Sequence, residues 1–195
     1  MEEKITIMPK PSTVSWEAVS HVLRTAHQKN VEAGVYMPYP FLEPEEIREK
    51  IESKGGVMFV AMVDDQLVGT GAVILLDKHF WCGKGKYGYH CFDAVLPEYE
   101  GKGVYKAIAA KQEAYVKSHD VDRIFFDTHE KNRRMIEMSR KSGYEFIEYR
   151  IRKDHNSVLM VKWLDQSPYS HLLCRTNFLK VKYITKIKHL LGMSC

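Results

Sequence analysis

The chain has 195 residues, 45% of them apolar and 28% charged, which is the composition of an ordinary globular protein and excludes a disordered or fibrous one. Its net charge of +4 is unevenly placed. Five of the 29 basic and one of the 25 acidic side chains lie in residues 165–195, which leaves 24 of each in residues 1–164. This neutral body argues against nucleic acid as a partner, because nucleic-acid-binding domains normally carry a basic face.

The four cysteines, at positions 82, 91, 174 and 195, form no C-x-x-C pair and have no matching histidine spacing. The sequence therefore predicts no metal site and no disulfide scaffold. The first ten residues lack the basic start and apolar stretch of a secretory signal, and the chain contains no run of about 18 apolar residues. We therefore expect a protein of the reducing cytoplasm.

Apolar periodicity predicts a single series of helices and strands without repeats. The first half is expected to contain a strand at 5–8, a helix from the N-cap Thr13 to residue 26 or 27, an aromatic loop at 31–44, a helix at 45–53, strands at 57–63 and 67–76, and a turn-like segment at 77–86. The second half is expected to contain a strand at 87–96, a helix at 104–118, a strand at 124–127, a helix at 132–141, and strands at 144–152 and 157–163. Such an interleaved order predicts an α/β fold with a mixed sheet and helices packed on it.

The most informative segment runs from residue 94 to residue 105, where a predicted strand ends in a glycine turn and a helix begins at once. The first N–H groups of a helix have no intrahelical acceptor, and the helix dipole adds about half a positive charge there, so this point suits a phosphate group. Gly101 and Gly103 would let a ligand approach the backbone, and Lys102 would add a positive charge. A glycine pair after a strand is also common in ordinary tight turns. The P-loop and Rossmann patterns are absent.

Residues 100–105 resemble the [QR]-x-x-G-x-[GA] acetyl-coenzyme A loop of the GCN5-related N-acetyltransferase (GNAT) superfamily, and residues 128–144 resemble a second motif of one of its branches. The resemblance covers roughly residues 1–164. It implies a central mixed, mostly antiparallel sheet flanked by helices. It also implies an enzyme, without a metal, that transfers an acetyl group from acetyl-coenzyme A to a primary amine of a small molecule or amino sugar by direct attack. The residues expected to contact the co-substrate are Val95, Leu96, Gly101, Lys102, Gly103, Val104, Tyr105 and Asn132.

Three residues depart from the family pattern. Glu100 replaces Gln or Arg and places a carboxylate beside the expected pyrophosphate, while Tyr105 replaces a small residue in the first helical turn. Ser139 stands where many members have the tyrosine that protonates the departing thiolate. These departures motivate an alternative, a catalytically silent relative that binds an acyl-coenzyme A or a protein partner.

Acyl transfer to an amine needs a base, because an amine is protonated at neutral pH. The strand before the glycine turn offers His90, whose intrinsic pKa of about 6.5 suits this role, and Asp93, which needs an upward shift or a relaying water. The two are three positions apart, so alternation places them on opposite faces unless a bulge intervenes. Ser139 completes the predicted catalytic set. His129 is a further candidate as an acid, or else a solvated loop histidine.

Two other regions could bind a partner. The superfamily loop that commonly covers the acceptor corresponds to the segment with Tyr36, Tyr39 and Phe41, although such aromatic residues also pack over helix ends. Residues 178–195 have the pattern of a basic amphipathic helix, which could lie on an anionic membrane surface, dock on the body or contact a second subunit. The chain is thus expected to contain an acyltransferase domain at 1–164 and a basic C-terminal extension at 165–195.

Overall fold

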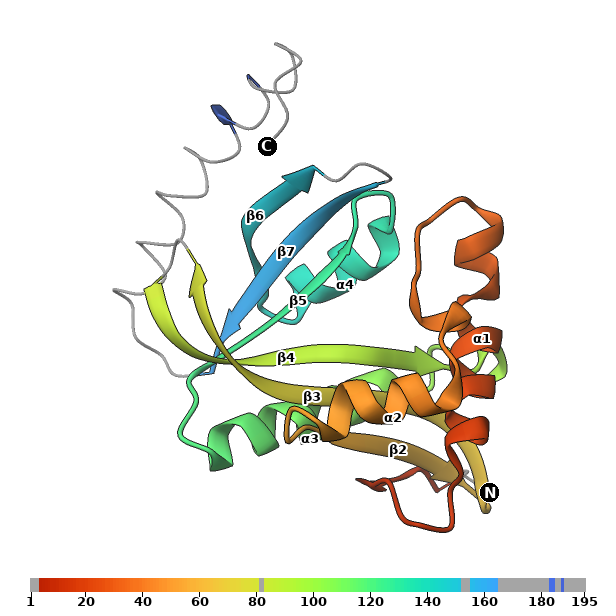
Figure 1. The fold of residues 1–195 in the computed structure, drawn as a ribbon. Coiled ribbons are helices and arrows are strands. Elements are labelled where there is room, and N and C mark those ends of the chain that lie inside the picture. The colour runs from red at the N-terminus through yellow and green to blue at the C-terminus, as the bar shows by residue number, and fades with distance from the viewer. Residues whose placement is uncertain (1–3, 81–82, 152–154, 165–182, 185–186, 188–195) are drawn as a thin grey trace. The chain divides into compact units, whose positions relative to one another are not determined.

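A computed structural model describes residues 4–80, 83–151, 155–164, 183–184 and 187 (Figure 1). The helices and strands in these residues are, in chain order, β1 (Thr6–Pro9), α1 (Trp16–Glu32), η1 (Tyr39–Phe41), α2 (Pro44–Glu52), β2 (Val57–Val63), β3 (Gln66–Phe80), β4 (Gly83–Val95), η2 (Pro97–Tyr99), α3 (Val104–Ser118), β5 (Arg123–His129), α4 (Arg133–Lys141), β6 (Glu145–Ile151) and β7 (Asn156–Trp163). They belong to two compact units, Met1–Leu76 with Gly88–Asp120 and Asp77–Tyr87 with Val121–Cys195.

The first unit contains strands in the order β1-β2-β3-β4, and β2 pairs antiparallel with both β1 and β3. The predicted tight turn between β2 and β3 is confirmed. Asp64 and Asp65 form it with φ angles of 45° and 66°. Two consecutive positive φ angles are typical of a type I′ hairpin turn, whose twist matches that of the strands it joins.

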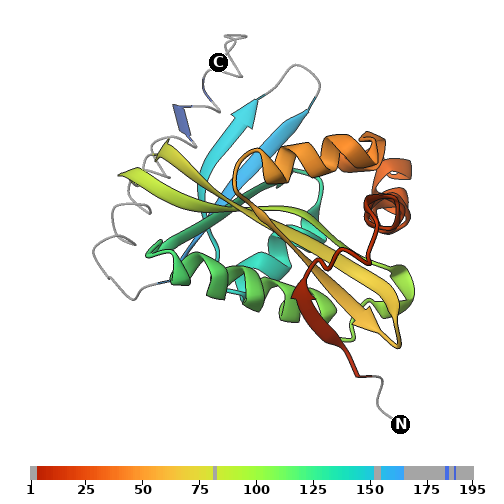
Figure 2. The same ribbon diagram turned by 60° about the horizontal axis from the view of Figure 1, so that its bottom comes forward.

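Helices cover both faces of the first unit's sheet (Figure 2). On one face, α1 and α2 bury Leu23 and Ile47 in a core that also contains Val60 of β2 and Ala72 of β3. On the other face lies α3. There a Cβ at Gly69 would come within 3.0 Å of a Val104 methyl group, so this glycine lets the helix lie close to the strand.

Helix α1 differs at both ends from its prediction. Its N-cap is Ser15, whose hydroxyl accepts a hydrogen bond from the Ala18 N–H at 3.2 Å, and not Thr13. The helix continues to Glu32, where Gln28 donates to Glu32 at 2.9 Å, a supporting i,i+4 pair. The predicted aromatic loop is correspondingly shorter and contains the turn η1.

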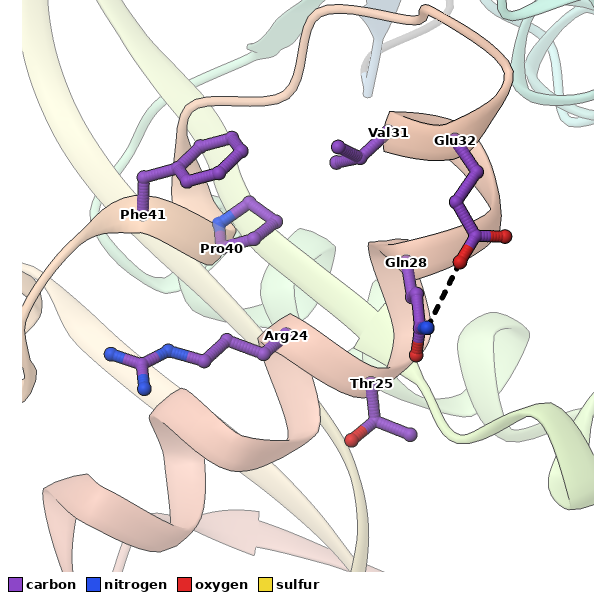
Figure 3. A pocket seen from close by; sticks show the side chains of 7 residues that line it. All are labelled: Arg24, Thr25, Gln28, Val31, Glu32, Pro40 and Phe41. Atoms are coloured by element: carbon purple, nitrogen blue, oxygen red, sulfur yellow. Dashed lines mark hydrogen bonds between the residues drawn. The ribbon is translucent and has the colours of Figure 1, made fainter.

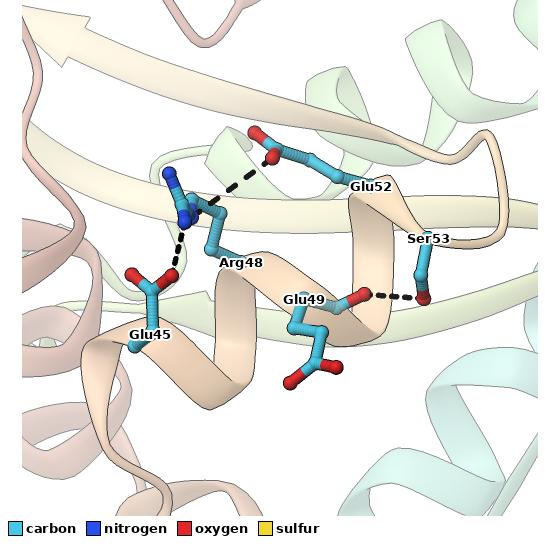
Figure 4. Close-up of polar contacts among 5 residues, drawn as sticks. All are labelled: Glu45, Arg48, Glu49, Glu52 and Ser53. Carbon is cyan, nitrogen blue, oxygen red and sulfur yellow. Dashed lines mark hydrogen bonds and ion pairs between the residues drawn. The ribbon is translucent and has the colours of Figure 1, made fainter.

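Helix α2 begins at Pro44, one residue before its predicted start. The Glu46 carboxylate accepts a hydrogen bond from the Glu43 N–H at 2.8 Å and so fixes the first turn. On the solvent side, Arg48 pairs with Glu45 and with Glu52 (Figure 4). Such exposed pairs contribute little to stability, so the buried Ile47 and Ile51 hold this helix in place.

The prediction of a turn over residues 77–86 is wrong at both ends, because β3 continues to Phe80 and β4 begins at Gly83. Gly85 is extended within β4. A Cβ at this position would lie 3.1 Å from Nη2 of Arg123 in the same unit. This glycine therefore serves a close approach within a strand and does not mark a turn.

The second unit contains strands in the order β5-β7-β6, with β7 antiparallel to both neighbours. Its buried side chains include Ile124 and Leu159. The Arg123 guanidinium stacks over the rings of Tyr87 and Trp163, with distances of 4.7 and 5.0 Å to the ring centroids. This unit therefore has its own apolar core, and the Arg123 guanidinium packs against two of its aromatic rings.

Most of the predicted C-terminal extension lies outside the described residues. Within it, Tyr183, Ile184 and Ile187 are helical, and these side chains are 63%, 52% and 54% exposed. The mixed α/β class with mostly antiparallel strands flanked by helices is confirmed. The division into domains at residue 164 stays a prediction.

Candidate active site

The loop before α3 has the geometry of an anion site. Gly101 and Gly103 have φ angles of 78° and 84°, in the left-handed region that favours glycine. Gly103 is the N-cap of α3, and no side chain caps the helix. A Cβ at either glycine would have no atom within 4 Å. The exposed loop thus leaves open space where a phosphate could reach backbone N–H groups and the positive end of the helix dipole.

The charged residues of the loop are both exposed to solvent. Lys102 lies over the Tyr99 ring, 4.7 Å from its centroid, and so keeps a positive charge at the loop. Glu100, the residue that departs from the family pattern, is also exposed and remains hydrated. Because solvent screens exposed charges, repulsion between Glu100 and a bound phosphate is weaker than a buried carboxylate would cause.

Val95 and Leu96, which are predicted to bind the co-substrate, differ in the direction of their backbone N–H and carbonyl groups. The Leu96 N–H donates to the Val68 carbonyl at 2.9 Å, and the Leu96 carbonyl accepts from the Tyr99 N–H at 2.9 Å. Successive backbone groups along a strand point to opposite sides, so the N–H and carbonyl of Val95 point away from β3. Val95 therefore fits the expected pairing with a pantetheine arm better than Leu96.

Tyr105 is partly buried on α3, beside Val104, which is fully buried. Burial, followed by the negative charges of Asp93 and Glu113, raises the pKa of the Tyr105 phenol well above its usual range. The phenol therefore stays protonated at neutral pH. No atom of Tyr105 lies within 4 Å of a Cβ position at Gly101 or Gly103, so the large residue does not fill the space at the glycine loop.

His90 and Asp93 lie on the same face of β4, which is the arrangement expected where a bulge interrupts the alternation. Between them Phe92 adopts φ 57°, a left-handed conformation of the kind that occurs in β-bulges. The Thr70 hydroxyl donates to the Phe92 carbonyl at 3.0 Å and holds this conformation. As a result the His90 Nδ1 lies 3.8 Å from the Asp93 Oδ2.

The Asp93 carboxylate is 12% exposed and contacts a residue that sequence reasoning did not single out as functional. Its Oδ1 accepts a hydrogen bond of 2.8 Å from Nε2 of Gln112 on α3. Burial raises the pKa of Asp93 to about 7, although the Gln112 hydrogen bond opposes this change. The carboxyl group can therefore accept and release a proton near neutral pH. Gln112 follows Ile108 by one helical turn, which marks it as inward-facing.

His27 is a second buried titratable residue that sequence reasoning did not select. It lies at the inner side of α1, four residues after Leu23, and its ring centroid is 6.3 Å from that of Tyr39. Burial lowers the pKa of His27 to about 4, with a smaller opposing effect from the Asp93 backbone. At neutral pH the imidazole is uncharged.

Two predicted site residues lie in the second unit, where Asn132 makes structural hydrogen bonds and Ser139 is buried. Asn132 caps α4: its Oδ1 accepts from the Met135 N–H at 3.3 Å, and its Nδ2 donates to the Thr128 hydroxyl at 3.2 Å. Ser139 is 1% exposed, and its hydroxyl has no hydrogen-bond partner among the described residues. A hydroxyl with so little access is poorly placed to donate a proton to a thiolate.

His129 is buried, not a solvated loop residue. Its Nδ1 accepts a hydrogen bond from the Lys131 N–H at 3.0 Å, and its ring stacks on that of His155 with centroids 6.0 Å apart. Burial lowers the pKa of His129. The neighbouring Glu130 accepts hydrogen bonds from Tyr149 and Asn156, so this cluster joins β5 to β6 and β7.

A pocket of about 400 Å³ lies in the first unit between α1 and η1 (Figure 3). Val31, Pro40 and Phe41 supply apolar surface, and the polar lining includes Gln28 and Glu32. Phe41 is 69% exposed and is the most exposed of the aromatic loop residues. By contrast, Tyr39 packs inward against Phe92, with ring centroids 4.6 Å apart.

The described residues contain no group of three or more His, Cys, Asp or Glu side chains that could hold a metal ion. In the same part of the chain, no helix combines the length and the apolar character needed to cross a membrane.

Comparison with solved structures shows which known proteins have this fold. An aminoglycoside 6'-acetyltransferase type Ii is 15% identical, with a TM-score of 0.65 over 85% of this chain and 99% of that one. A PaiA N-acetyltransferase from Thermoplasma acidophilum in complex with coenzyme A is 18% identical, with a TM-score of 0.63 over 82% and 99%. The ribosomal-protein-S18-alanine N-acetyltransferase from Escherichia coli is 14% identical, with a TM-score of 0.62 over 84% and 96%.

These identities are low, so the structural similarities establish the fold alone. The comparison with curated proteins found no match. The model of the acetyltransferase (GNAT) family matches residues 16–144, which is more than half of the chain and includes the glycine loop, Asp93 and Gln112. The protein therefore belongs to the acetyltransferase (GNAT) family.

Proposed function

We propose that the chain transfers an acetyl group from acetyl-coenzyme A to a primary amine of a small molecule or amino sugar by direct attack. The open, uncapped loop at Gly101 and Gly103 carries this proposal, because a Cβ at either position would enter space that no protein atom fills. Lys102, Val104 and the backbone of Val95 complete the expected co-substrate contacts. Acetyl-coenzyme A supplies the activated acetyl group as a thioester.

Asp93 is the best supported base among the predicted residues. Its pKa of about 7 matches the requirement for a group that changes protonation near neutral pH. The His90 ring beside it is buried, with no exposed side-chain surface, and acts through Asp93. In the proposed reaction, Asp93 accepts the proton of the attacking amine directly or through one water.

The other steps of the proposed reaction are bond formation to the acetyl carbon, cleavage of the thioester and protonation of the thiolate. The amine nitrogen forms a bond to the acetyl carbonyl carbon, the carbon–sulfur bond breaks, and the departing thiolate receives a proton from solvent or from the protonated Asp93. The Val95 N–H, which points away from β3, would donate to the carbonyl oxygen as negative charge develops on it.

The pocket between α1 and η1 supports an acceptor with both apolar and polar surface. Phe41 offers an exposed aromatic face, and Gln28 and Glu32 offer hydrogen-bonding groups, a combination typical of small-molecule sites. Glu32 also suits a cationic amine, and Arg24, the cation of the same lining, pairs with Glu43 at 3.7 Å. One protein of similar fold is named as an aminoglycoside acetyltransferase, in agreement with an amino-sugar acceptor.

Two measurements test the proposed function. Calorimetry with acetyl-coenzyme A should show binding at a 1:1 ratio, and absence of binding at millimolar concentration would refute the proposal. Thiol release over a panel of amines and amino sugars should then identify an acceptor. Replacement Phe41→Ala should raise its KM, whereas Tyr36→Ala, at an exposed aromatic residue outside the pocket lining, should not.

A catalytically silent relative remains the second candidate, favoured by the buried Ser139 hydroxyl at the position of the usual acid. This candidate predicts acyl-coenzyme A binding without turnover over the whole amine panel. Thioester cleavage stimulated by any amine would exclude it.

The C-terminal extension at 165–195 is proposed as a separate element that follows an acyltransferase domain at 1–164 in a cytoplasmic protein. The exposed apolar side chains Tyr183, Ile184 and Ile187 support contact with an anionic membrane or a second subunit. Co-sedimentation with anionic vesicles and the mass in solution distinguish these partners. Loss of either property on deletion of residues 178–195 is the expected result, and no effect on either would refute this role.

A further inference from the structure

Gln112 makes two fixed contacts inside the first unit. The residue is fully buried on α3, and its Nε2 lies 2.9 Å from the Ala72 carbonyl of β3 and 2.8 Å from Oδ1 of Asp93 on β4. A carbonyl oxygen can only accept, so the atom near Ala72 must be the amide nitrogen. Both amide hydrogens are therefore used, and Asp93 Oδ1 receives one of them.

Gly71 provides the space for this contact. A Cβ at this position would lie 2.5 Å from the Asp93 Oδ1, 2.5 Å from Cγ2 of Ile108 and 2.9 Å from the Gln112 Nε2. Separations this short do not occur in folded proteins, so any side chain here would displace the carboxylate or the amide together with Ile108. Gly71 of β3, Asp93 of β4 and Gln112 of α3 therefore pack closely around the Oδ1 atom of Asp93.

The two oxygens of Asp93 consequently differ. Oδ1 is held by the donor of Gln112, and Oδ2 faces Nδ1 of His90 at 3.8 Å. The bulge at Phe92 puts the imidazole and the carboxylate on one face. A proton gained by this carboxyl group belongs on Oδ2, because Oδ1 is already an acceptor for an N–H group.

We propose that Gln112 is a positioning residue for acetyl transfer, which fixes Oδ1 of Asp93 so that Oδ2 exchanges the proton, and that Gly71 supplies the space for this arrangement. This inference rests on the proposed function for its catalytic consequence. The link between Gln112 and the Asp93 carboxyl group can be measured without any reaction.

The electrostatic effect of Gln112 has a definite sign. A hydrogen bond donated to the charged form favours that form, so Gln112 lowers the pKa of Asp93 against the larger, opposite effect of burial. The other titratable groups near Asp93 are His90 on β4, Tyr105 on α3 with Glu113 beside it, and His27 of α1 near the Asp93 backbone.

The test replaces Gln112 by methionine, which has a similar length but no donor. Loss of a hydrogen bond to a charged group should raise the pKa of Asp93 by about one unit or more. The acidic limb of kcat/KM should move to higher pH by the same amount, with activity recovered above that limb. Replacement Gln66→Met, at an exposed position of β3 outside the pocket lining, is the matched control and should leave the profile unchanged.

A second readout does not depend on catalysis. The Asp93 carboxyl carbon, labelled with ¹³C and assigned by its loss in the variant Asp93→Asn, is titrated by NMR in the wild type and in Gln112→Met. The midpoint should rise in the variant. If the midpoint rises but the wild type transfers no acetyl group, the contact stands and the proposed function fails.

Two glycine variants distinguish the contact from general packing of α3. Both Gly71→Ala and Gly69→Ala crowd this helix, but only the first places a methyl group against Asp93 and Gln112. The carboxyl midpoint should shift in Gly71→Ala and stay unchanged in Gly69→Ala. If Gly71→Ala does not fold, the Gln112→Met titration alone decides. An unshifted midpoint together with an equal loss of kcat at every pH would overturn the proposal.

Discussion

The two units use their polar side chains differently. In the first unit, Asp93, His90 and Gln112 gather beside a left-handed residue, and burial shifts the carboxyl pKa to about 7. In the second unit, Asn132 caps a helix and Glu130 is bound by two neutral donors. Functional sites tolerate strain and perturbed pKa values, whereas Asn132 and Glu130 make hydrogen bonds that join elements of the second unit. The difference assigns the proposed chemistry to the first unit.

The largest expected effect follows from Asp93→Asn. An amide cannot accept the proton of the amine, so kcat/KM for acetyl transfer should fall by about 10²- to 10⁴-fold. Asp65→Asn, at an exposed residue of the β2–β3 turn, is the control and should retain full activity. Equal activity of the wild type and Asp93→Asn would remove the distinction between the units.

The next effect concerns stability, because two buried groups of the first unit have opposite pH dependences. The raised pKa of Asp93 means that the folded protein holds an extra proton, so this contribution to stability falls as pH rises from 3.8 to about 7. The lowered pKa of His27 means that folding releases a proton, so its contribution rises between about pH 4 and 6.5. Each contribution is at most about 3 to 4 kcal/mol.

A variant that lacks Asp93 or His27 should show the pH dependence of stability that the other residue causes. Urea unfolding of Asp93→Asn should give a free energy of unfolding that increases from pH 4 to 6.5. The same measurement on His27→Leu should give one that decreases from pH 4 to 7. Slopes of the same sign in the two variants would contradict the assigned pKa shifts.

A smaller effect is expected at the glycine loop. A Cβ at Gly103 would enter the proposed phosphate site, so Gly103→Ala should weaken coenzyme A binding tenfold or more by calorimetry. Gly34→Ala is a matched control, because Gly34 also has a positive φ, 69°, and open space around its Cβ position. Both variants should lose about 1 to 2 kcal/mol of stability from backbone strain. Equal coenzyme A affinity in both would show that the loop is only a turn.

In the second unit, Asn132→Ala removes a helix cap and should cost about 1 kcal/mol in the free energy of unfolding. Coenzyme A affinity should stay within twofold of the wild type. A tenfold loss of affinity in calorimetry would instead establish Asn132 as a co-substrate contact, as the family resemblance implies.

The smallest effect is expected from Ser139→Ala. The Ser139 hydroxyl is buried without a described partner, so its removal should change the free energy of unfolding by less than about 0.5 kcal/mol. The turnover rate should not change. If the turnover rate instead fell by about two orders of magnitude, this serine would be identified as the acid, and the second unit would have a direct part in the chemistry.

Much of the fold follows from local sequence signals. The β2–β3 turn and most helices and strands were predicted from periodicity and turn residues, because these signals lie within a few neighbouring positions. The errors lie at the ends of elements. The start of α1 depends on which of two hydroxyl residues caps it, and the length of β3 and β4 depends on strand pairing that keeps Gly83 and Gly85 extended.

The sequence by itself determined the glycine loop, the family resemblance and the candidate residues His90 and Asp93. Tertiary structure decided that these two residues meet, because the bulge at Phe92 is held by Thr70, 22 positions away. It also brought Gln112 to Asp93 and Ala72, over separations of 19 and 40 residues. Local periodicity carries no signal for such contacts, since they depend on how closely a helix lies against a strand.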